Sequence, residues 1–173
     1  MCGSRAPAKV KALPSTSNLW QNRRMKTFHS PKSSIHVIVR GLLVQAGNII
    51  LCRAKGQNWF FLPGGHVENG EAVRVALLRE LNEEIGNADY DISSFVGVCE
   101  NIFFLDDKSQ QHELNIIFEV DLPKNTAVIS KEEHIEFISV TKEQLLTLKI
   151  LPMKLKHGLL KWFENEMPFL EEI

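Results

Sequence analysis

Apolar residues along this chain follow two different periods. Short β-rich runs lie on either side of one long segment with helical spacing. The runs expected to form strands are residues 36–44, 48–53, 59–62, 94–105, 113–122 and 137–140. A short helix is expected at 142–148, and a last one from Pro152 with an apolar face. Strands, a helix, more strands and two helices predict an α/β fold, in which helices pack on a mixed sheet.

Residues 1–34 do not share this periodicity. They hold three prolines among small and basic residues and no acid, so we expect a poorly ordered basic extension. A domain of residues 35–173 follows, long enough for a full core. No apolar region typical of a secretory signal is expected in the extension. Its Arg and Ser content weakly resembles an organellar transit peptide, and Met25 is an alternative start.

One predicted helix carries three carboxylates beside its apolar stripe. It belongs to the segment LPGGHVENGEAVRVALLRELNEEIGN, residues 62–87. At about 100° per residue, Glu80, Glu83 and Glu84 share an arc of roughly 100°. Their mutual repulsion would turn into binding around a hard divalent cation such as Mg²⁺ or Mn²⁺. For so short a motif taken alone, a solvated acidic face is the alternative.

The same segment resembles a longer signature. Gly65 is followed by five residues, Glu71, seven residues and then RELNEEIGN from Arg79 to Asn87. This is similar to the Nudix hydrolase box GX5EX7REUXEEXGU, where U is a bulky aliphatic residue, and only Asn87 departs from it. The resemblance implies a Nudix-type α/β/α sandwich with a mixed β-sheet and the box helix packed on it.

The resemblance also implies roles for the residues that the box specifies. Mg²⁺, with Mn²⁺ as a substitute, would be held by the Gly64 carbonyl and by the carboxylates of Glu80, Glu83 and Glu84. These three acids would also carry catalysis. Among them, Glu80 is either a ligand or the base that takes the proton from water. Glu71 and Arg79 would pair and brace the loop against the helix. A surface ion pair of little energetic value is the alternative.

Four residues outside the box are further candidates by the same resemblance. Arg53, at the end of the second strand, and Lys55 nearby occupy positions where relatives contact substrate phosphate. Glu132 and Glu133 precede the last predicted strand, where relatives often place another acidic ligand or base. A solvated loop is the plainer interpretation of these two acids.

Charge is divided unevenly along the chain. Residues 1–67 contain ten of the 20 Lys and Arg and no acid, which leaves a balance of −11 in residues 68–173. This polarity suits a metal-dependent enzyme acting on an anionic phosphate substrate, although a solvated basic tail explains it equally well. Three cysteines form no metal or redox motif, and no apolar run reaches the length of a membrane span. We therefore expect a cytoplasmic protein with free thiols.

The activity implied is Mg²⁺-dependent hydrolysis of a phosphoanhydride bond in a nucleoside diphosphate linked to another moiety. A nucleoside triphosphate or modified nucleotide is favoured, because ADP-ribose-selective relatives often carry a proline about 15 residues beyond the box, whereas the first proline here is Pro123. An ADP-sugar or dinucleotide pyrophosphatase and a non-catalytic Nudix-fold nucleotide-binding module are the alternatives. Neither a membrane nor nucleic acid is expected as a partner, with capped RNA as the exception. A homodimer is left open.

Overall fold

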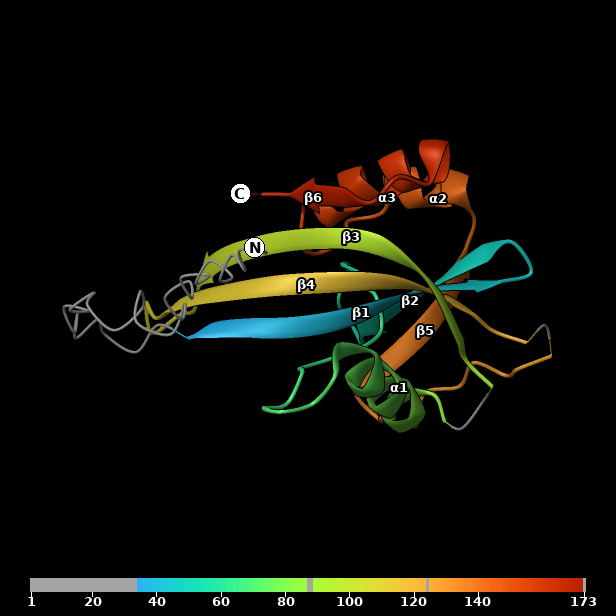
Figure 1. The fold of residues 1–173 in the computed structure, drawn as a ribbon, viewed down its shortest axis with the longest axis horizontal. Helices are drawn as coiled ribbons and strands as arrows, with labels where there is room; N and C mark the ends of the chain where they lie inside the picture. Colours follow the sequence, from blue (N-terminus) through green and yellow to red (C-terminus); the bar gives the residue numbers. More distant parts are fainter. Residues whose placement is uncertain (1–33, 87–88, 124, 173) are drawn as a thin grey trace, which may run out of the picture. The chain divides into compact units, whose positions relative to one another are not determined.

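The computed structural model of the chain describes residues 34–86, 89–123 and 125–172. The expected extension, apart from Ser34, lies outside these residues. Six strands form one mixed sheet, with α1 on one face and α2 and α3 on the other (Figure 1). The elements in chain order are β1 (Ile35–Gln45), β2 (Asn48–Ala54), α1 (Val73–Glu84), β3 (Asp91–Phe104), β4 (Gln110–Asp121), β5 (Ile135–Val140), α2 (Lys142–Thr147), α3 (Leu155–Asn165) and β6 (Phe169–Glu171). The α/β fold with a mixed sheet is confirmed.

The sheet opens into a fork between β1 and β2. Its strand order is β5-β2-β1-β4-β3-β6, and β1 runs parallel to β4. The antiparallel pairing of β1 with β2 is confined to the residues next to their connecting turn. Farther along, the Val39 N–H donates to the Gly65 carbonyl and the Gly41 N–H donates to the Pro63 carbonyl, each at 2.9 Å. The glycine-rich loop is therefore held on β1 by backbone hydrogen bonds, as a strand would be.

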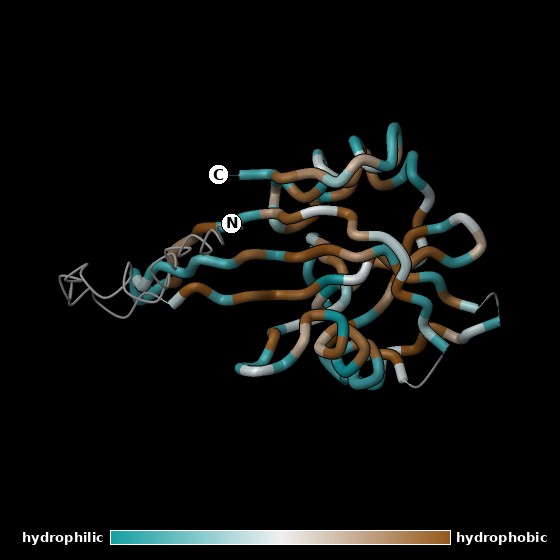
Figure 2. The backbone as a smooth tube through the Cα atoms, in the orientation of Figure 1, coloured by the Kyte–Doolittle hydropathy of each residue, from teal (hydrophilic) through white to brown (hydrophobic). Residues whose placement is uncertain are grey.

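Two apolar layers hold the sheet between the helices. On one face, Leu77 and Leu81 of α1 pack in a cluster with Val39 of β1. On the other face, Leu159 and Trp162 of α3 belong to a second buried cluster. Figure 2 shows apolar stretches along the central strands and on the helices that cover them. Because its apolar side is fixed on the sheet, α1 carries its acids at the margin of this contact.

The structure corrects three expectations about secondary structure. Residues 59–62 form no strand and contribute isolated bridges at Phe60 and Phe61. The last helix begins at Leu155 rather than at Pro152, because residues 152–154 form a turn that the Leu155 N–H closes onto the Pro152 carbonyl at 3.0 Å. Strand β6 was not expected, since its three residues owe their conformation to pairing with the distant β3.

Across the residues described, no helix is both long and apolar enough to cross a membrane.

Candidate active site

Gly64 lies where the loop meets both β1 and α1. Its φ of +121° falls in the region that favours glycine, and a Cβ here would stand 2.2 Å from the Val39 carbonyl oxygen. The Gly64 N–H donates to Glu84 Oε2 at 3.0 Å. The glycine thus lets the loop approach β1 while its amide holds a carboxylate of the helix.

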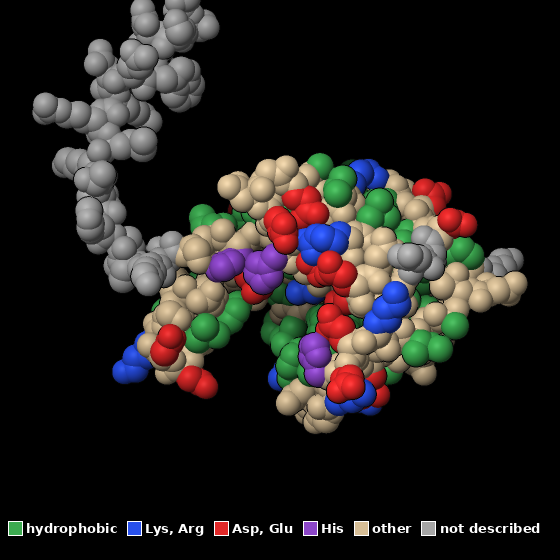
Figure 3. All heavy atoms as spheres, turned by 90° about the horizontal axis from the view of Figure 1, so that it is seen from below, with side chains coloured by type: hydrophobic (Ala, Val, Ile, Leu, Met, Phe, Trp, Pro, Cys, Tyr) green, Lys and Arg blue, Asp and Glu red, His purple; other side chains and the backbone are tan. Residues whose placement is uncertain are grey.

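Gly65 lies against the carboxylate of Glu80. A Cβ on Gly65 would lie 2.4 Å from the Glu80 carboxyl carbon, so this carboxylate packs directly on bare backbone. Glu80 and Glu84 are one helical turn apart and meet two consecutive glycines. Acidic side chains border a hollow in the face shown in Figure 3. Two of the three acids predicted for catalysis are therefore brought to the glycine-rich loop.

Gly64, Gly65, Glu80 and Glu84 form what we call the glycine-acid corner, and Arg79 connects its acids to their neighbours. Its Nε and Nη2 donate to the two carboxylate oxygens of Glu71, each at 3.0 Å, which gives a bidentate pair. Its Nη1 donates to Glu80 Oε1 at 2.8 Å and to Glu83 Oε2 at 3.4 Å, and Nη2 also reaches the His66 carbonyl at 2.9 Å. Hydrogen bonds from Arg79 hold the pKa of Glu71 below its usual range. The pair expected from the box thus links the loop to α1.

Glu84 is the buried acid of the group. Its relative exposure is 7%, whereas the Glu83 side chain is 57% exposed. Burial raises the pKa of Glu84 to about 7, with smaller contributions in the same direction from the charges of Glu132 and Glu80. The Gly64 N–H and the Arg40 guanidinium oppose this rise in pKa. A negative charge at Glu84 is costly in this position and would be relieved by a nearby cation.

Arg40 of β1 is a site residue that the sequence did not reveal. Its Nη1 donates to the Leu62 carbonyl at 3.1 Å and to the Gly64 carbonyl at 2.5 Å. Its guanidinium carbon lies 5.6 Å from the centre of the Phe61 ring, and burial lowers its pKa. The one signal in the sequence was an arginine inside an apolar strand. The carbonyl expected to face a metal therefore already accepts a hydrogen bond from Arg40.

The four candidates outside the box have different surroundings. Arg53 forms an ion pair with Glu136, in which its Nε donates to Glu136 Oε1 at 2.8 Å. Lys55 lines a shallow hollow together with Glu132 and Glu133. Of these, Glu132 is half-buried and lies near enough to Glu84 to raise its pKa. The charge of Glu132 therefore acts on one of the carboxylates expected to bind the metal.

The described residues contain no group of three His, Cys, Asp or Glu side chains ready to hold a metal ion. Glu80 and Glu83 are both bonded to Arg79, and Glu84 is bonded to Gly64. Their chemistry nevertheless fits Mg²⁺, which prefers carboxylate and carbonyl oxygens. Each of these carboxylates has lone pairs that the present hydrogen bonds leave available.

Replacing Gly65 with Ala tests the contact with Glu80. The new methyl group would displace the Glu80 carboxylate, which is the far end of a flexible side chain, so the fold should lose less than about 1 kcal/mol. We expect kcat for metal-dependent hydrolysis to fall by about tenfold to a hundredfold. Steady-state kinetics and urea unfolding check the two effects. Unchanged kcat in a folded variant would remove Glu80 from the proposed machinery.

Comparison with known proteins places the fold and the glycine-acid corner in one family. The NUDIX domain family matches residues 33–163. An ADP-ribose pyrophosphatase of Methanocaldococcus jannaschii is 34% identical over 89 residues, which cover 50% of this chain and 50% of that protein. The match thus spans about half the length of this curated relative.

Two solved structures show the same fold at low identity. A UDP-X diphosphatase superposes with a TM-score of 0.59 at 18% identity, covering 83% of this chain and 70% of that one. A MutT protein from Methanosarcina mazei Go1 gives 0.58 at 22% identity, covering 79% and 99%. The family match extends over β1 to β5 and the glycine-acid corner. The chain belongs to the Nudix hydrolase family.

Proposed function

We propose that this chain is a Mg²⁺-dependent hydrolase that cleaves a phosphoanhydride bond in a nucleoside diphosphate linked to another moiety. A nucleoside triphosphate or modified nucleotide is the favoured substrate. The observation that carries the proposal is the corner where the buried Glu84 accepts from the Gly64 amide while Glu80 packs on Gly65. Carboxylates and close backbone at one point suit the handling of a metal-bound phosphate.

The residues of the glycine-acid corner, with Glu83, would bind the metal and handle the proton of the attacking water. Glu80, Glu83 and Glu84 would hold the ion, and Gly64 can contribute the carbonyl lone pair that Arg40 leaves available. A bound divalent ion would neutralise phosphate charge and lower the pKa of attacking water. Glu80 is a ligand or the base that accepts the proton of that water.

The residues around the acids would keep them in place. Through its hydrogen bonds, Arg79 fixes the rotamers of Glu71 and Glu80 and ties the loop to α1. Glu132 is a further acidic candidate because its charge acts on Glu84. Arg53 and Lys55 remain candidates for contacting substrate phosphate, and Arg53 would do so with its terminal nitrogens while its Nε stays paired with Glu136.

Glu83→Gln tests this function directly. The substitution keeps the shape of an exposed side chain and removes one charge, so we expect kcat to fall at least about a hundredfold in a folded protein. Phosphate, pyrophosphate and product nucleotides would be measured with Mg²⁺ and Mn²⁺, because ADP-ribose and NADH yield AMP and no free phosphate or pyrophosphate. The panel would cover canonical and oxidised nucleoside triphosphates, ADP-ribose, NADH, diadenosine tetraphosphate and capped RNA.

The matched control is Glu164→Gln, which makes the same change at an exposed position of α3, on the other face of the sheet. It should retain full activity. Equal turnover in both variants would contradict the proposal, and nucleotide binding without any cleavage would favour a non-catalytic binding module.

ADP-ribose is the second candidate substrate. The observation that favours it is the 34% identity to the archaeal ADP-ribose pyrophosphatase. Selective release of AMP from ADP-ribose in the same panel would decide for it. We also propose a cytoplasmic location, because Cys52 and Cys99 are both free thiols in the buried core.

A further inference from the structure

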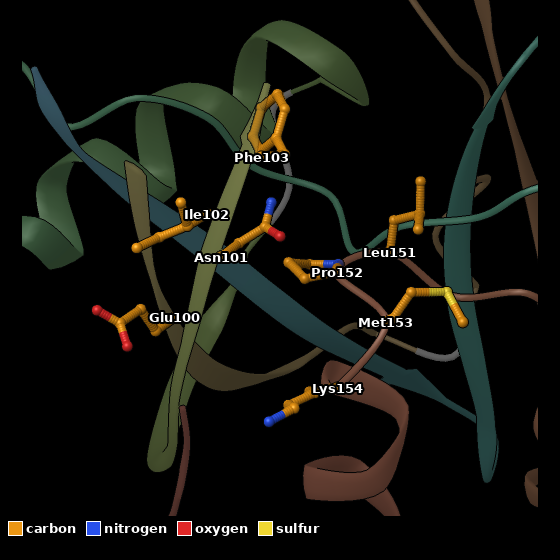
Figure 4. Close-up of a pocket in the computed structure, with 8 residues that line it drawn as sticks. All are labelled: Glu100, Asn101, Ile102, Phe103, Leu151, Pro152, Met153 and Lys154. Carbon is orange, nitrogen blue, oxygen red and sulfur yellow. The ribbon is translucent and has the colours of Figure 1, made fainter. Parts of the chain in front are cut away.

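A cleft beside the glycine-acid corner has polar groups in an otherwise apolar wall. We name it the β4 cleft; its two parts share Asn101, Phe103, Leu151 and Pro152. The larger part has a volume of about 520 Å³, within the range of small-molecule sites. In Figure 4, the side chains of Asn101 and Phe103 turn toward Leu151 and Pro152, whereas those of Glu100 and Ile102 turn away.

Arg40 connects the β4 cleft to the glycine-rich loop. Arg40 lines its smaller part and donates to the Gly64 carbonyl, whose own amide holds Glu84. A molecule with phosphates at the acids would therefore reach the β4 cleft with its other end.

Asn115, at the floor of the β4 cleft, has an unused donor. The residue is 0% exposed, and no described residue accepts a hydrogen bond from its Nδ2. Its orientation is set by Arg40, whose Nε donates to Asn115 Oδ1 at 3.4 Å, so Nδ2 must point elsewhere. Buried donors without partners destabilise a fold and are rare, which indicates that a ligand supplies the acceptor.

Glu113 supplies an acceptor two residues away on the same face of β4. Asn101, directly opposite on β3, donates its Nδ2 to Glu113 Oε2 at 3.2 Å. No described residue donates to the other carboxylate oxygen, Oε1, which can accept further hydrogen bonds, as can Oε2 through a second lone pair. The floor of the β4 cleft thus offers a carboxylate acceptor next to an amide donor.

The walls of the cleft suit a flat ring. Trp59 and Phe61, with ring centres 5.7 Å apart, line its smaller part together with Phe103. Aromatic side chains stack on any nucleobase, so they give affinity without choosing among bases. Selection among the bases would therefore depend on Glu113 and Asn115 at the polar floor of the cleft.

We propose that the β4 cleft binds the base of the substrate and selects guanine, with Glu113 accepting from its N1–H and 2-amino group and Asn115 donating to O6. Among the common bases, guanine alone presents two adjacent donors beside an acceptor on its Watson–Crick edge. Adenine and cytosine present one donor there, and uracil places its one donor between two acceptors. This inference rests on the proposed function for its account of the phosphates, and it names the substrate class of the same site.

Binding of nucleoside monophosphates to the full chain in EDTA tests the base site alone. These probes have no anhydride to cleave, and no metal is present to hold their phosphate. By calorimetry we expect GMP to bind at least about tenfold more tightly than IMP, AMP, CMP or UMP, because IMP lacks the 2-amino group.

Glu113→Gln should reduce the affinity for GMP to about that for IMP, because it removes the acceptor for the 2-amino group. Asn115→Leu should weaken the binding of GMP and IMP to a similar extent, because both present O6. Glu119→Gln, six residues farther along β4, should keep the preference. If Asn115→Leu fails to fold, Glu113→Gln alone decides. Equal affinity for GMP and IMP in the wild type, or a preference for GMP over IMP that folded Glu113→Gln retains, would overturn the inference.

The outcomes separate the two proposals. Metal-dependent hydrolysis with no preference among bases would overturn guanine selection and leave the proposed function standing. Selective GMP binding without hydrolysis of any guanine nucleotide or other member of the panel would overturn the proposed function and leave guanine selection standing.

Discussion

Glu84→Gln is expected to abolish turnover and at the same time to stabilise the metal-free protein above pH 7. The loss of a proposed metal ligand should lower kcat by at least about a hundredfold. The gain in stability has a separate cause, which is the burial of a carboxylate whose exposed fraction is 7%. A neutral amide keeps the shape and avoids the cost of a buried charge.

The pH dependence follows from the pKa of Glu84, which burial raises from an ordinary 4.5 to about 7. A raised carboxyl pKa means that the folded state binds the proton more tightly than the unfolded state. The free energy of unfolding therefore falls as the pH rises from about 4.5 and levels off above about 7. The total loss is about 3 kcal/mol at most, at 1.36 kcal/mol per pKa unit.

Urea unfolding in EDTA at pH 5 and pH 8 measures this effect. Wild type should lose stability between the two values relative to Glu84→Gln, while Glu164→Gln, at an exposed position, should follow wild type. Added Mg²⁺ should restore wild type at pH 8 and not the Glu84 variant, because the ion binds an ionised carboxylate. Parallel pH profiles for wild type and Glu84→Gln in EDTA would contradict a buried, costly charge.

Gly64→Ala is expected to have the largest effect on stability. Its Cβ would stand 2.2 Å from the Val39 carbonyl oxygen, a backbone atom that cannot move without breaking the loop from β1. Its φ of +121° adds strain for any residue with a side chain. Together the overlap and the strain should cost about 4 kcal/mol. Activity should be lost as well, because the amide that holds Glu84 must shift.

Gly70→Ala is the matched control for this substitution. Gly70 also has a positive φ, +84°, but a Cβ there would meet nothing within 4 Å. It should cost about 1–2 kcal/mol, which is the strain of a left-handed conformation alone. The difference between the two variants in urea unfolding measures the close approach of the loop to β1. Equal losses would show that this approach does not matter.

The features that could be predicted depend on residues close together in the sequence. Alternating and helical periods located eight of the elements in outline. The resemblance to the Nudix box implied the pairing of Glu71 with Arg79, which the structure contains. Strand β6 was missed because its three residues form a strand through contact with β3, more than 60 positions earlier. Pro152 misled the prediction because proline suits a turn as well as a first helical residue.

The contacts of the candidate site could also be predicted only in part from the sequence. Arg53 was expected to contact substrate phosphate, and the structure pairs its Nε with Glu136 on the neighbouring strand. Arg40 looked like an isolated charge, yet the fork in the sheet brings the carbonyls of Leu62 and Gly64 to its guanidinium. Neither pairing has a local signal, because each depends on which strands become neighbours and in which register.

By itself, the sequence determined the α/β fold, the box and a helix that presents Glu80, Glu83 and Glu84 together, because helical periodicity and glycine spacing are local properties. Only the tertiary structure decided that Glu84 is buried while Glu83 is exposed, that Arg40 holds the Gly64 carbonyl, and that Asn115 has a donor without a partner. Burial and pairing depend on what the rest of the chain places around a side chain, which spacing along the sequence does not contain.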